Sequence, residues 1–291
     1  MMTSLLATAP GKLVLMGEYA VLDGAPALVL AVHRGVGCRV EPGPGPVLID
    51  TPGGDDRFVR AALETVGAAP GRYHFFDLDP LDLPGKPGFG GSAAATVAAV
   101  LAGGGRGPEA FEVHHRVQGG GSGVDVAASL YGGLLRFEGG RASPLPAVQP
   151  VVVFSGQPAR TGPRVERFRA WRDGRERFVG ESTALVERFA SEPMVAMAEA
   201  GALLASMARS AGIAYLTPAL EHIAALAVQH GGAAKPSGAG GGDCAVALLP
   251  DPEATGSFEL ACRDAGLVVI PVRPASGASV RTIDPDGESH A

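Results

Sequence analysis

The sequence predicts an α+β fold made of two domains. Its 291 residues are enough for about two domains of ordinary size. Short apolar runs bounded by glycine or proline alternate with segments of helical spacing, and no internal repeat of fixed length is present. A proline-containing connection separates the strands expected at 134–137 and 151–154, and we place the domain boundary there. The predicted domains are therefore 1–145 and 146–291.

The first half of the chain mixes strands with helices. Apolar and β-branched runs between turn residues predict strands at 13–16, 27–32, 36–40, 47–49, 73–78 and 134–137. Helical spacing of the apolar residues predicts helices at 57–66, 93–102, 109–118 and 124–130.

The second half is mostly helical in its middle part. Strands are predicted at 151–154, 244–249 and 267–272. Residues 163–230 have helical spacing with breaks near Pro193, Gly212 and Pro218, and another helix is expected at 251–265. We expect a loose tail after about residue 275.

Charge and composition exclude several classes of partner. The formal net charge is −6 and the pI is about 5.7, which disfavours nucleic acid and anionic membranes as partners. No apolar stretch reaches the roughly 18 residues of a membrane span, and the N-terminus lacks the basic region of a signal peptide. The three cysteines have no metal-site spacing. We expect a cytoplasmic monomer or homodimer with no nucleic acid or membrane partner.

Lysine is rare in this chain and always lies close to glycine. Of 24 basic residues only Lys12, Lys86 and Lys235 are lysines, and each lies within three residues of a glycine. Glycine loops can present several backbone N–H groups to a phosphate, and a lysine adds a compact positive charge. The alternative is that three surface lysines lie near loops by chance. The pattern favours a small anionic substrate bearing phosphate.

The glycine loop at 86–92 is followed directly by the predicted helix at 93–102. Gly88, Gly90 and Gly91 allow close backbone approach, and the helix N-terminus adds partial positive charge. Ser92 can offer its hydroxyl to Mg²⁺, cap the helix, or do both. The loop therefore predicts a polyphosphate site.

The same loop also matches the weak dinucleotide pattern G-x-G-x-x-A at Gly88, Gly90 and Ala93. We disfavour a dinucleotide fold because the pattern lies deep in the chain and does not follow the first strand. The P-loop pattern G-x-x-x-x-G-K-[ST] is absent from the sequence.

Three glycine motifs in a fixed order cover most of the chain. They are Pro10-Gly11-Lys12, the glycine loop at 86–94 and a third glycine loop at 235–244. With these motifs the sequence resembles the GHMP kinases, the superfamily of galactokinase, homoserine, mevalonate and phosphomevalonate kinases. The resemblance implies the two-domain GHMP kinase fold, with an N-terminal ribosomal-protein-S5-like domain that binds nucleotide and a C-terminal ferredoxin-like α/β domain. It also implies ATP and Mg²⁺ as cofactors.

Within the superfamily the motifs are most similar to those of phosphomevalonate kinases. The similarity is carried by residues 17–22, by 121–128 and above all by Ser-Gly-Ala-Gly-Gly-Gly-Asp-Cys at 237–244. It implies phosphorylation of (R)-5-phosphomevalonate to (R)-5-diphosphomevalonate in the mevalonate pathway of isoprenoid synthesis. The alternatives are a mevalonate kinase acting on the alcohol, and a non-catalytic ligand sensor with the same fold.

The resemblance implies Lys12, Lys86 and Asp125 as catalytic residues. A phosphomonoester has a second pKa of about 6, so the accepting oxygen is already anionic near neutral pH and needs little help from a base. The reaction then depends on alignment and on neutralising charge, for which the two lysines and Mg²⁺ are suited. We favour Asp125 as the group that orients Lys12. The alternatives are a base for an alcohol and a carboxylate that only meets a helix dipole.

The other residues implied by the resemblance fall into three groups. The ATP-binding residues are Gly88, Gly90, Gly91, Ser92, Ala93, Gly238, Gly240 and Gly241. The substrate-binding residues are Lys12, Glu18, Tyr19, His114, Ser122, Arg160, Thr161 and Ala239. Ser92 is also the expected metal ligand, and which carboxylate joins it stays open, with Glu112 as a nearby candidate.

Arginines at 164–177 alternate with acidic residues. We expect this run to be a solvated helix face, with a cationic rim for anionic substrate as the lesser alternative.

Overall fold

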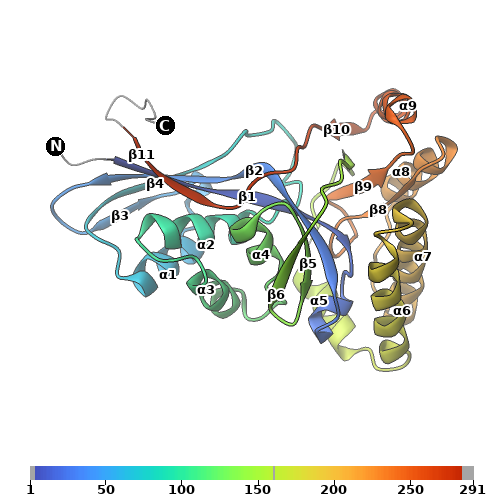
Figure 1. The fold of residues 1–291 in the computed structure, drawn as a ribbon, viewed down its shortest axis with the longest axis horizontal. Coiled ribbons are helices and arrows are strands. Elements are labelled where there is room, and N and C mark those ends of the chain that lie inside the picture. The colour runs from blue at the N-terminus through green and yellow to red at the C-terminus, as the bar shows by residue number, and fades with distance from the viewer. Residues whose placement is uncertain (1–3, 160, 284–291) are drawn as a thin grey trace.

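The computed structural model describes residues 4–159 and 161–283, which form two β-sheets flanked by helices (Figure 1). The larger sheet has seven strands. They are β1 (Ser4–Met16), β2 (Ala27–Pro42), β3 (Val47–Asp50), β4 (Gly71–Asp77), β5 (Leu134–Glu138), β6 (Arg141–Leu145) and β11 (Ser279–Ile283). The main order is β11-β1-β2-β4-β3, and β5 joins β2 to β6. All the pairs are antiparallel except β3 with β4.

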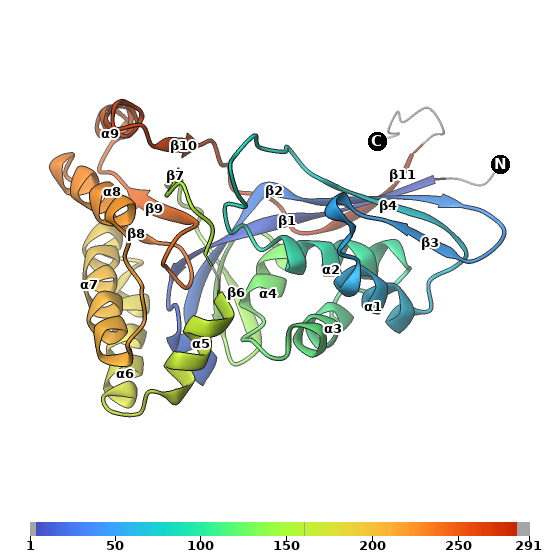
Figure 2. The ribbon, with the colours of Figure 1, turned by 180° about the vertical axis from the view of Figure 1, so that it is seen from behind.

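Four helices cover one face of this sheet. They are α1 (Arg57–Val66), α2 (Gly91–Ala102), α3 (Glu109–Gln118) and α4 (Val124–Tyr131) (Figure 2). Helices α2 and α4 pack directly on β1 and β2, and α1 and α3 pack against α2. Most of the side chains of α2 are buried alanine and valine, which let the helix approach the strands closely. The helices predicted in this half are confirmed.

The smaller sheet has four antiparallel strands in the order β10-β7-β9-β8. They are β7 (Val151–Phe154), β8 (Ala233–Pro236), β9 (Cys244–Leu248) and β10 (Val268–Ile270). The helices of this half are α5 (Thr161–Ala170), α6 (Arg175–Arg188), α7 (Pro193–Ala211), α8 (Pro218–Gln229) and α9 (Pro252–Asp264). The breaks predicted near Pro193, Gly212 and Pro218 fall between these helices.

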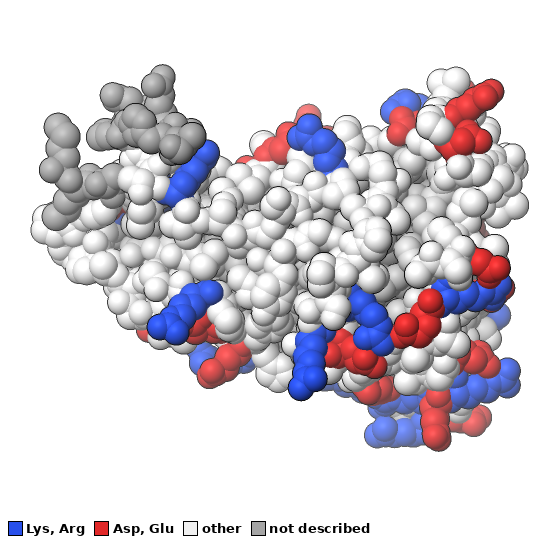
Figure 3. Space-filling view, in the orientation of Figure 1, with Lys and Arg blue, Asp and Glu red and all other residues white. Residues whose placement is uncertain are grey.

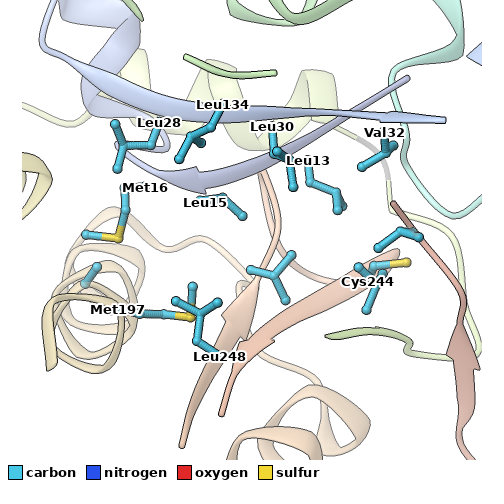
Figure 4. Packing of buried hydrophobic residues seen from close by; sticks show 14 of the residues in the cluster. Leu13, Leu15, Met16, Leu28, Leu30, Val32, Leu134, Met197, Cys244 and Leu248 are labelled. Atoms are coloured by element: carbon cyan, nitrogen blue, oxygen red, sulfur yellow. The ribbon is translucent and has the colours of Figure 1, made fainter. Parts of the chain in front are cut away.

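The two sheets share one hydrophobic core. Leu13, Leu15 and Leu30 of the larger sheet pack with Val246 and Leu248 of β9, as Figure 4 shows for the labelled leucines. Met197 of α7 joins the same core (Figure 4). Val14 lies instead in a cluster with residues of α4, because successive side chains of a strand point to opposite faces. Lys12, two residues before Val14 on the same strand, therefore has its side chain on the α4 face of the sheet.

Two predicted strand limits were wrong near the glycines at 11, 35 and 37. The strand predicted at 13–16 begins at Ser4, and the strands predicted at 27–32 and 36–40 form one strand of 16 residues. The pairing of β1 with β2 shifts between Pro10 and Gly11. A Cβ atom on Gly35 would lie 2.0 Å from the carbonyl oxygen of Ala9. Glycine at this position therefore allows β1 and β2 to approach closely, whereas the sequence analysis had placed a turn here. Strands β6 and β8 were missed by the sequence analysis.

The loose tail expected after residue 275 is wrong for the residues that can be described. Ser279–Ile283 form β11, which pairs antiparallel with β1 from Ser4 to Thr8. Isolated bridges join Val32 to Pro274 and Gly132 to Ser276. Without β11 the edge of β1 would expose unpaired N–H and C=O groups. Backbone pairing alone satisfies these groups, so the covering strand does not need apolar side chains. The rest of the expected tail lies outside the described residues, and the domain boundary at 145 stays a prediction.

Charged side chains gather over α6 and α7 (Figure 3). Many of them are paired within a helix or between the two, such as Arg177 with Glu181 and Arg188 with Glu192 and Glu199. Within the described ranges, no helix is both long and apolar enough to cross a membrane.

Candidate active site

The structure brings the first two glycine motifs together around Lys12. The backbone N–H of Lys12 donates a hydrogen bond to the carbonyl oxygen of Phe89, with a distance of 2.9 Å. Gly90 has φ +70°, and a Cβ atom there would lie 2.9 Å from both Cγ and Cε of Lys12. Glycine at position 90 therefore leaves the space that the Lys12 side chain occupies.

The third glycine loop, residues 238–242, closes on the same place. Ser237 Oγ accepts a hydrogen bond from Val14 N at 3.0 Å and donates one to Val14 O at 3.1 Å. A Cβ atom on Gly88 would lie 2.6 Å from Oδ2 of Asp243, the residue that ends the loop. The three motifs thus meet beside one stretch of β1, although more than 200 residues separate Val14 from Ser237.

Lys12 forms an ion pair with Asp125. Its Nζ lies 3.6 Å from Asp125 Oδ1, and the two side chains are 10% and 33% exposed. Asp125 is in the first turn of α4, the helix against which Val14 of β1 packs. The pair is therefore sheltered by the fold and still open to a ligand on the carboxylate side.

A second pair, Ser92 and His114, lies at the N-terminus of α2. Ser92 Oγ is 3.2 Å from Nε2 of His114. The helix begins at Gly91 with Gly90 as its cap residue and without a side-chain cap, so Ser92 does not cap α2. Burial lowers the pKa of His114, the charge of Asp125 opposes this change, and the charge of His115 adds to it. A neutral imidazole therefore faces the serine hydroxyl.

Asp243 is a second carboxylate of the site, to which the sequence analysis assigned no role. Its Oδ1 accepts a hydrogen bond from Ala159 N at 2.7 Å. Burial raises the pKa of Asp243, while the Ala159 hydrogen bond and the charges of Lys12 and Arg164 oppose this rise. The only signal in the sequence was its position at the end of a glycine motif.

Arg164 was also missed, because the arginine run was expected to be a solvated helix face. Its Nε donates to Ala214 O at 3.1 Å and its Nη2 to Gly241 O at 3.3 Å. Farther along, Arg167 donates to Gly212 O and Arg175 pairs with Asp23. The expectation was wrong for Arg164 and Arg175, whose partly buried side chains reach past the helix to carbonyl and carboxylate groups, and it is confirmed for Arg167, Arg169, Arg172 and Arg177, which are exposed.

Lys235 is not available for the phosphate contact that its neighbouring glycines suggested, and Glu18, a predicted substrate-binding residue, is buried beside it. Both side chains are almost completely buried, at 0% and 2% exposure, and they form an ion pair. Lys235 Nζ also donates to Pro236 O at 3.1 Å. Nearness to a glycine in the sequence did not show which way the ammonium group points, and here it points into the core.

Tyr19 is buried beside the same loop. Its hydroxyl donates to the carbonyl oxygen of Ala239 at 2.7 Å, and its ring packs on Phe168 with centroids 5.2 Å apart. Burial raises its pKa, with a smaller increase from Glu18 and an opposing effect of Arg164. Tyr19 therefore holds the loop, and contact of Tyr19 or Ala239 with substrate stays a prediction.

Lys86 lies on the outer part of its loop and is exposed. The pKa of Asp55 is lowered to about 2, chiefly by hydrogen bonds from Arg57 and in small part by the charge of Lys86. A Cβ atom on Gly85 would lie 3.3 Å from Pro158, so the loop rests on the segment after β7. Among the contacts of the described residues, none joins Lys86 to Lys12 or Asp125.

The remaining predicted residues occupy the edges of this cluster. Ser122 Oγ accepts from Val124 N at 3.3 Å, Thr161 begins α5 in an exposed position, and Ala93 is buried in the first turn of α2. Arg160 lies outside the described residues. In 4–159 and 161–283, no three His, Cys, Asp or Glu side chains gather as a metal cluster, and Glu112 pairs with Arg116 on the surface.

Comparison with known proteins supports a kinase. The sequence model of the family "GHMP kinases C terminal" matches residues 193–266. The chain is 30% identical to the phosphomevalonate kinase of Streptomyces sp. (strain CL190), over 92% of this chain and 96% of that protein. It is 34% identical to the mevalonate kinase of Methanothermobacter thermautotrophicus, over 57% of this chain and 63% of that one.

A solved structure extends the similarity to the whole fold. The phosphomevalonate kinase of Streptococcus pneumoniae, in complex with phosphomevalonate and AMPPNP, superposes with a TM-score of 0.74. The identity is 19%, and the superposition covers 94% of this chain and 100% of the other. The chain belongs to the GHMP kinase family. It has the α+β fold of these ATP-dependent phosphotransferases, as the sequence analysis predicted.

Proposed function

We propose that this protein is a phosphomevalonate kinase, which transfers the γ-phosphoryl group of ATP to (R)-5-phosphomevalonate and forms (R)-5-diphosphomevalonate and ADP. The observation that carries the proposal is the meeting of three glycine motifs around the Lys12–Asp125 pair. The similarity to the Streptomyces phosphomevalonate kinase, which extends over nearly the whole chain, supports the choice of substrate. The acceptor carries its own phosphate, which matches a site rich in backbone N–H groups.

In this proposal an oxygen of the substrate phosphate attacks the γ-phosphorus of ATP. The bond between the γ-phosphorus and the oxygen that bridges it to the β-phosphate breaks, and ADP leaves. The acceptor phosphate is already mostly ionised near pH 7, so charge neutralisation and alignment are the main tasks of the protein. Lys12 is the cation at the centre of the cluster, and we assign it to the acceptor and γ-phosphate oxygens.

Asp125 acts on Lys12 rather than as a base. Its carboxylate lies 3.6 Å from Lys12 Nζ, close enough to orient the ammonium group. Asp125 is fixed on α4 and Lys12 on β1, so the ion pair keeps the ammonium group directed into the site. The base role would fit an alcohol acceptor, and substrate discrimination tests it.

The N-terminus of α2 is proposed to hold the triphosphate of ATP. Gly91 and Ser92 form its first turn without a side-chain cap, so their N–H groups and the helix dipole favour an anion. Gly88, Gly90, Ala93, Gly238, Gly240 and Gly241 are assigned to the same nucleotide. Lys86 is assigned to phosphate from the open side of the loop.

Mg²⁺ fits the donor set of this site. The Ser92 hydroxyl is an oxygen ligand beside the proposed phosphates, and Mg²⁺ bound to a nucleotide needs few ligands from the protein. When bound, the ion would neutralise charge on the phosphates. The neutral His114 ring orients the Ser92 hydroxyl, which is the role we propose for it instead of direct substrate contact.

The test is a coupled assay of ADP release with phosphomevalonate and mevalonate offered separately. We expect turnover with phosphomevalonate and at most weak turnover with mevalonate. Turnover of mevalonate alone would assign the protein to the other substrate, and turnover of neither would support a ligand-sensing role. The matched control is Lys12→Met, which must abolish activity that belongs to this site.

A further inference from the structure

Glu18 and Lys235 form the most deeply buried ion pair among the described residues. Glu18 belongs to the turn between β1 and the 3-10 helix at Ala20–Asp23, and Lys235 belongs to β8. The pair therefore connects the larger sheet to the strand that leads into the 238–242 loop. Its side chains have almost no contact with solvent.

The contacts of this pair continue into the loop. Glu18 Oε1, which pairs with Lys235, also lies 3.4 Å from the backbone N–H of Gly238. Lys235 Nζ donates to Pro236 O at 3.1 Å. The two charged groups thus contact the backbone on both sides of Ser237, at the start of the loop.

Two tyrosines hold the rest of the loop from the same side. Tyr19, next to Glu18 in the chain, donates to Ala239 O at 2.7 Å. Gly241 N donates to Tyr215 O at 2.6 Å, and a Cβ atom on Gly240 would lie 2.2 Å from the Tyr215 ring. Burial raises the pKa of both phenol groups, and the charge of Glu18 adds a smaller increase to each.

Stability alone is a weak reason for such a pair. Replacing a buried ion pair by apolar side chains of similar size is often neutral or stabilising. A loop with four glycines in five residues has many conformations open to it, so directional contacts are needed to hold one. Asp243, at the end of the loop, faces Gly88 and the Lys12 charge, so the loop conformation also determines the position of Asp243.

We propose that Glu18 and Lys235 are positioning residues: their buried ion pair fixes the 238–242 loop in the conformation that binds ligand, without either residue touching the ligand. This inference rests on the proposed role of the loop in binding nucleotide and substrate. It predicts that the affinity for a ligand depends on the pair even when the stability of the fold does not.

The test compares Lys235→Met with the double variant Glu18→Leu/Lys235→Met. The single variant leaves an unpaired buried carboxylate and should unfold at lower urea concentration, whereas the double variant has no buried charge and should return to near the wild-type midpoint. Titration with Mg²⁺-AMPPNP and, separately, with phosphomevalonate should show at least one of the two bound about tenfold more weakly by the double variant. Amide hydrogen exchange in 236–243 should also be faster.

Asp23→Asn is the matched control. Asp23 lies five residues after Glu18 in the chain. Its Oδ2 accepts a hydrogen bond from Arg175 Nε at 2.7 Å, and the substitution removes the charge of this ion pair. We expect wild-type affinity for both ligands in this variant.

Wild-type affinity for both ligands in the double variant would overturn the inference. If the double variant does not fold, Glu18→Gln tests the same point, since it removes the charge but keeps the shape, and unchanged affinities there would overturn it as well. Failure of the proposed function looks different: the wild type then binds Mg²⁺-AMPPNP but releases ADP with mevalonate alone or with neither mevalonate nor phosphomevalonate. A wild type that binds neither ligand would overturn both.

Discussion

The protein contains two pairs of lysine and carboxylate that differ in their surroundings. Lys12 and Asp125 lie 3.6 Å apart with side chains that are partly open to solvent, whereas Lys235 and Glu18 are enclosed by the core. Burial lowers the pKa of Lys235, and the charge and hydrogen bond of Glu18 oppose this change. We expect the open pair to exchange its contacts for those of a phosphate and the closed pair to keep them. The comparison shows that the position of a lysine in the fold, rather than a neighbouring glycine, decides whether it can bind a ligand.

The largest expected effect comes from Lys12→Met. We expect kcat to fall about 10³-fold, because a cation that stabilises transferred charge is lost. The free energy of unfolding should change by less than about 1 kcal/mol, since methionine keeps the buried aliphatic stem of Lys12 and the Asp125 carboxylate, which is 33% exposed, stays in contact with solvent. Steady-state kinetics and urea unfolding measure both quantities. In Lys235→Met, by contrast, the free energy of unfolding should fall by about 3–5 kcal/mol, because the Glu18 carboxylate is left buried without its partner. Equal stability losses in the two variants would remove the distinction between the pairs.

Lys86→Met tests whether an exposed lysine of a glycine loop can still serve the site. We expect kcat/KM for phosphomevalonate to fall about 10²-fold, through lost charge at the phosphates, with an unchanged urea midpoint. Arg141→Met is the control, because it removes an exposed cation from β6. If the two variants had the same near-normal kcat/KM, Lys86 would no longer belong to the proposed site.

Gly90→Ala tests whether the position of the Lys12 side chain depends on the glycine loop beside it. A methyl group here would crowd Lys12, and the φ of +70° is unfavourable for alanine. We expect kcat to fall about tenfold and stability to fall by about 1–2 kcal/mol. Gly256→Ala, in α9 with open space around it, should keep kcat and leave stability equal or up to about 1 kcal/mol higher. A Gly90→Ala enzyme with normal kcat would show that Lys12 tolerates displacement.

The smallest effect is expected from His114→Gln. Burial lowers the pKa of His114 below its ordinary value of 6.5. As the pH falls from that value, the unfolded chain takes up a proton before the folded protein does, so the histidine makes the wild type less stable. The variant should therefore lose less stability than the wild type between about pH 6.5 and 5, by at most about 1.4 kcal/mol per pH unit. Urea unfolding across this range measures the difference, and parallel pH curves for the two proteins would contradict it.

Local patterns were sufficient to predict most of the elements and the order of the glycine motifs. The buried alanine run of α2 and the turn-bounded strands depend on short-range spacing, which the sequence displays directly. The resemblance also pointed to Lys12 and Asp125, which the fold brings together. These features needed no knowledge of how distant segments pack.

Apart from β6, which pairs with β5 across the turn at Gly139 and Gly140, the missed features depend on long-range contacts. Lys235 points into the core, where it pairs with Glu18. These two residues are 217 positions apart in the chain, so no local pattern indicates the pair. Arg164 reaches the carbonyl oxygens of Ala214 and Gly241, and no periodicity within α5 indicates those partners. Strand β11 is polar and mostly exposed, so only the free edge of β1 explains its position.

The pairing of β11 with β1 also has a topological consequence. Ser4 lies opposite Ile283 in the ladder, so the first and the last described residues are neighbours. A short flexible linker between these strands would join them without disturbing the sheet, and new ends could be opened in the exposed turn at 43–46 between β2 and β3. Such a circular permutant would keep the catalytic cluster intact while changing the order in which the two sheets are synthesised.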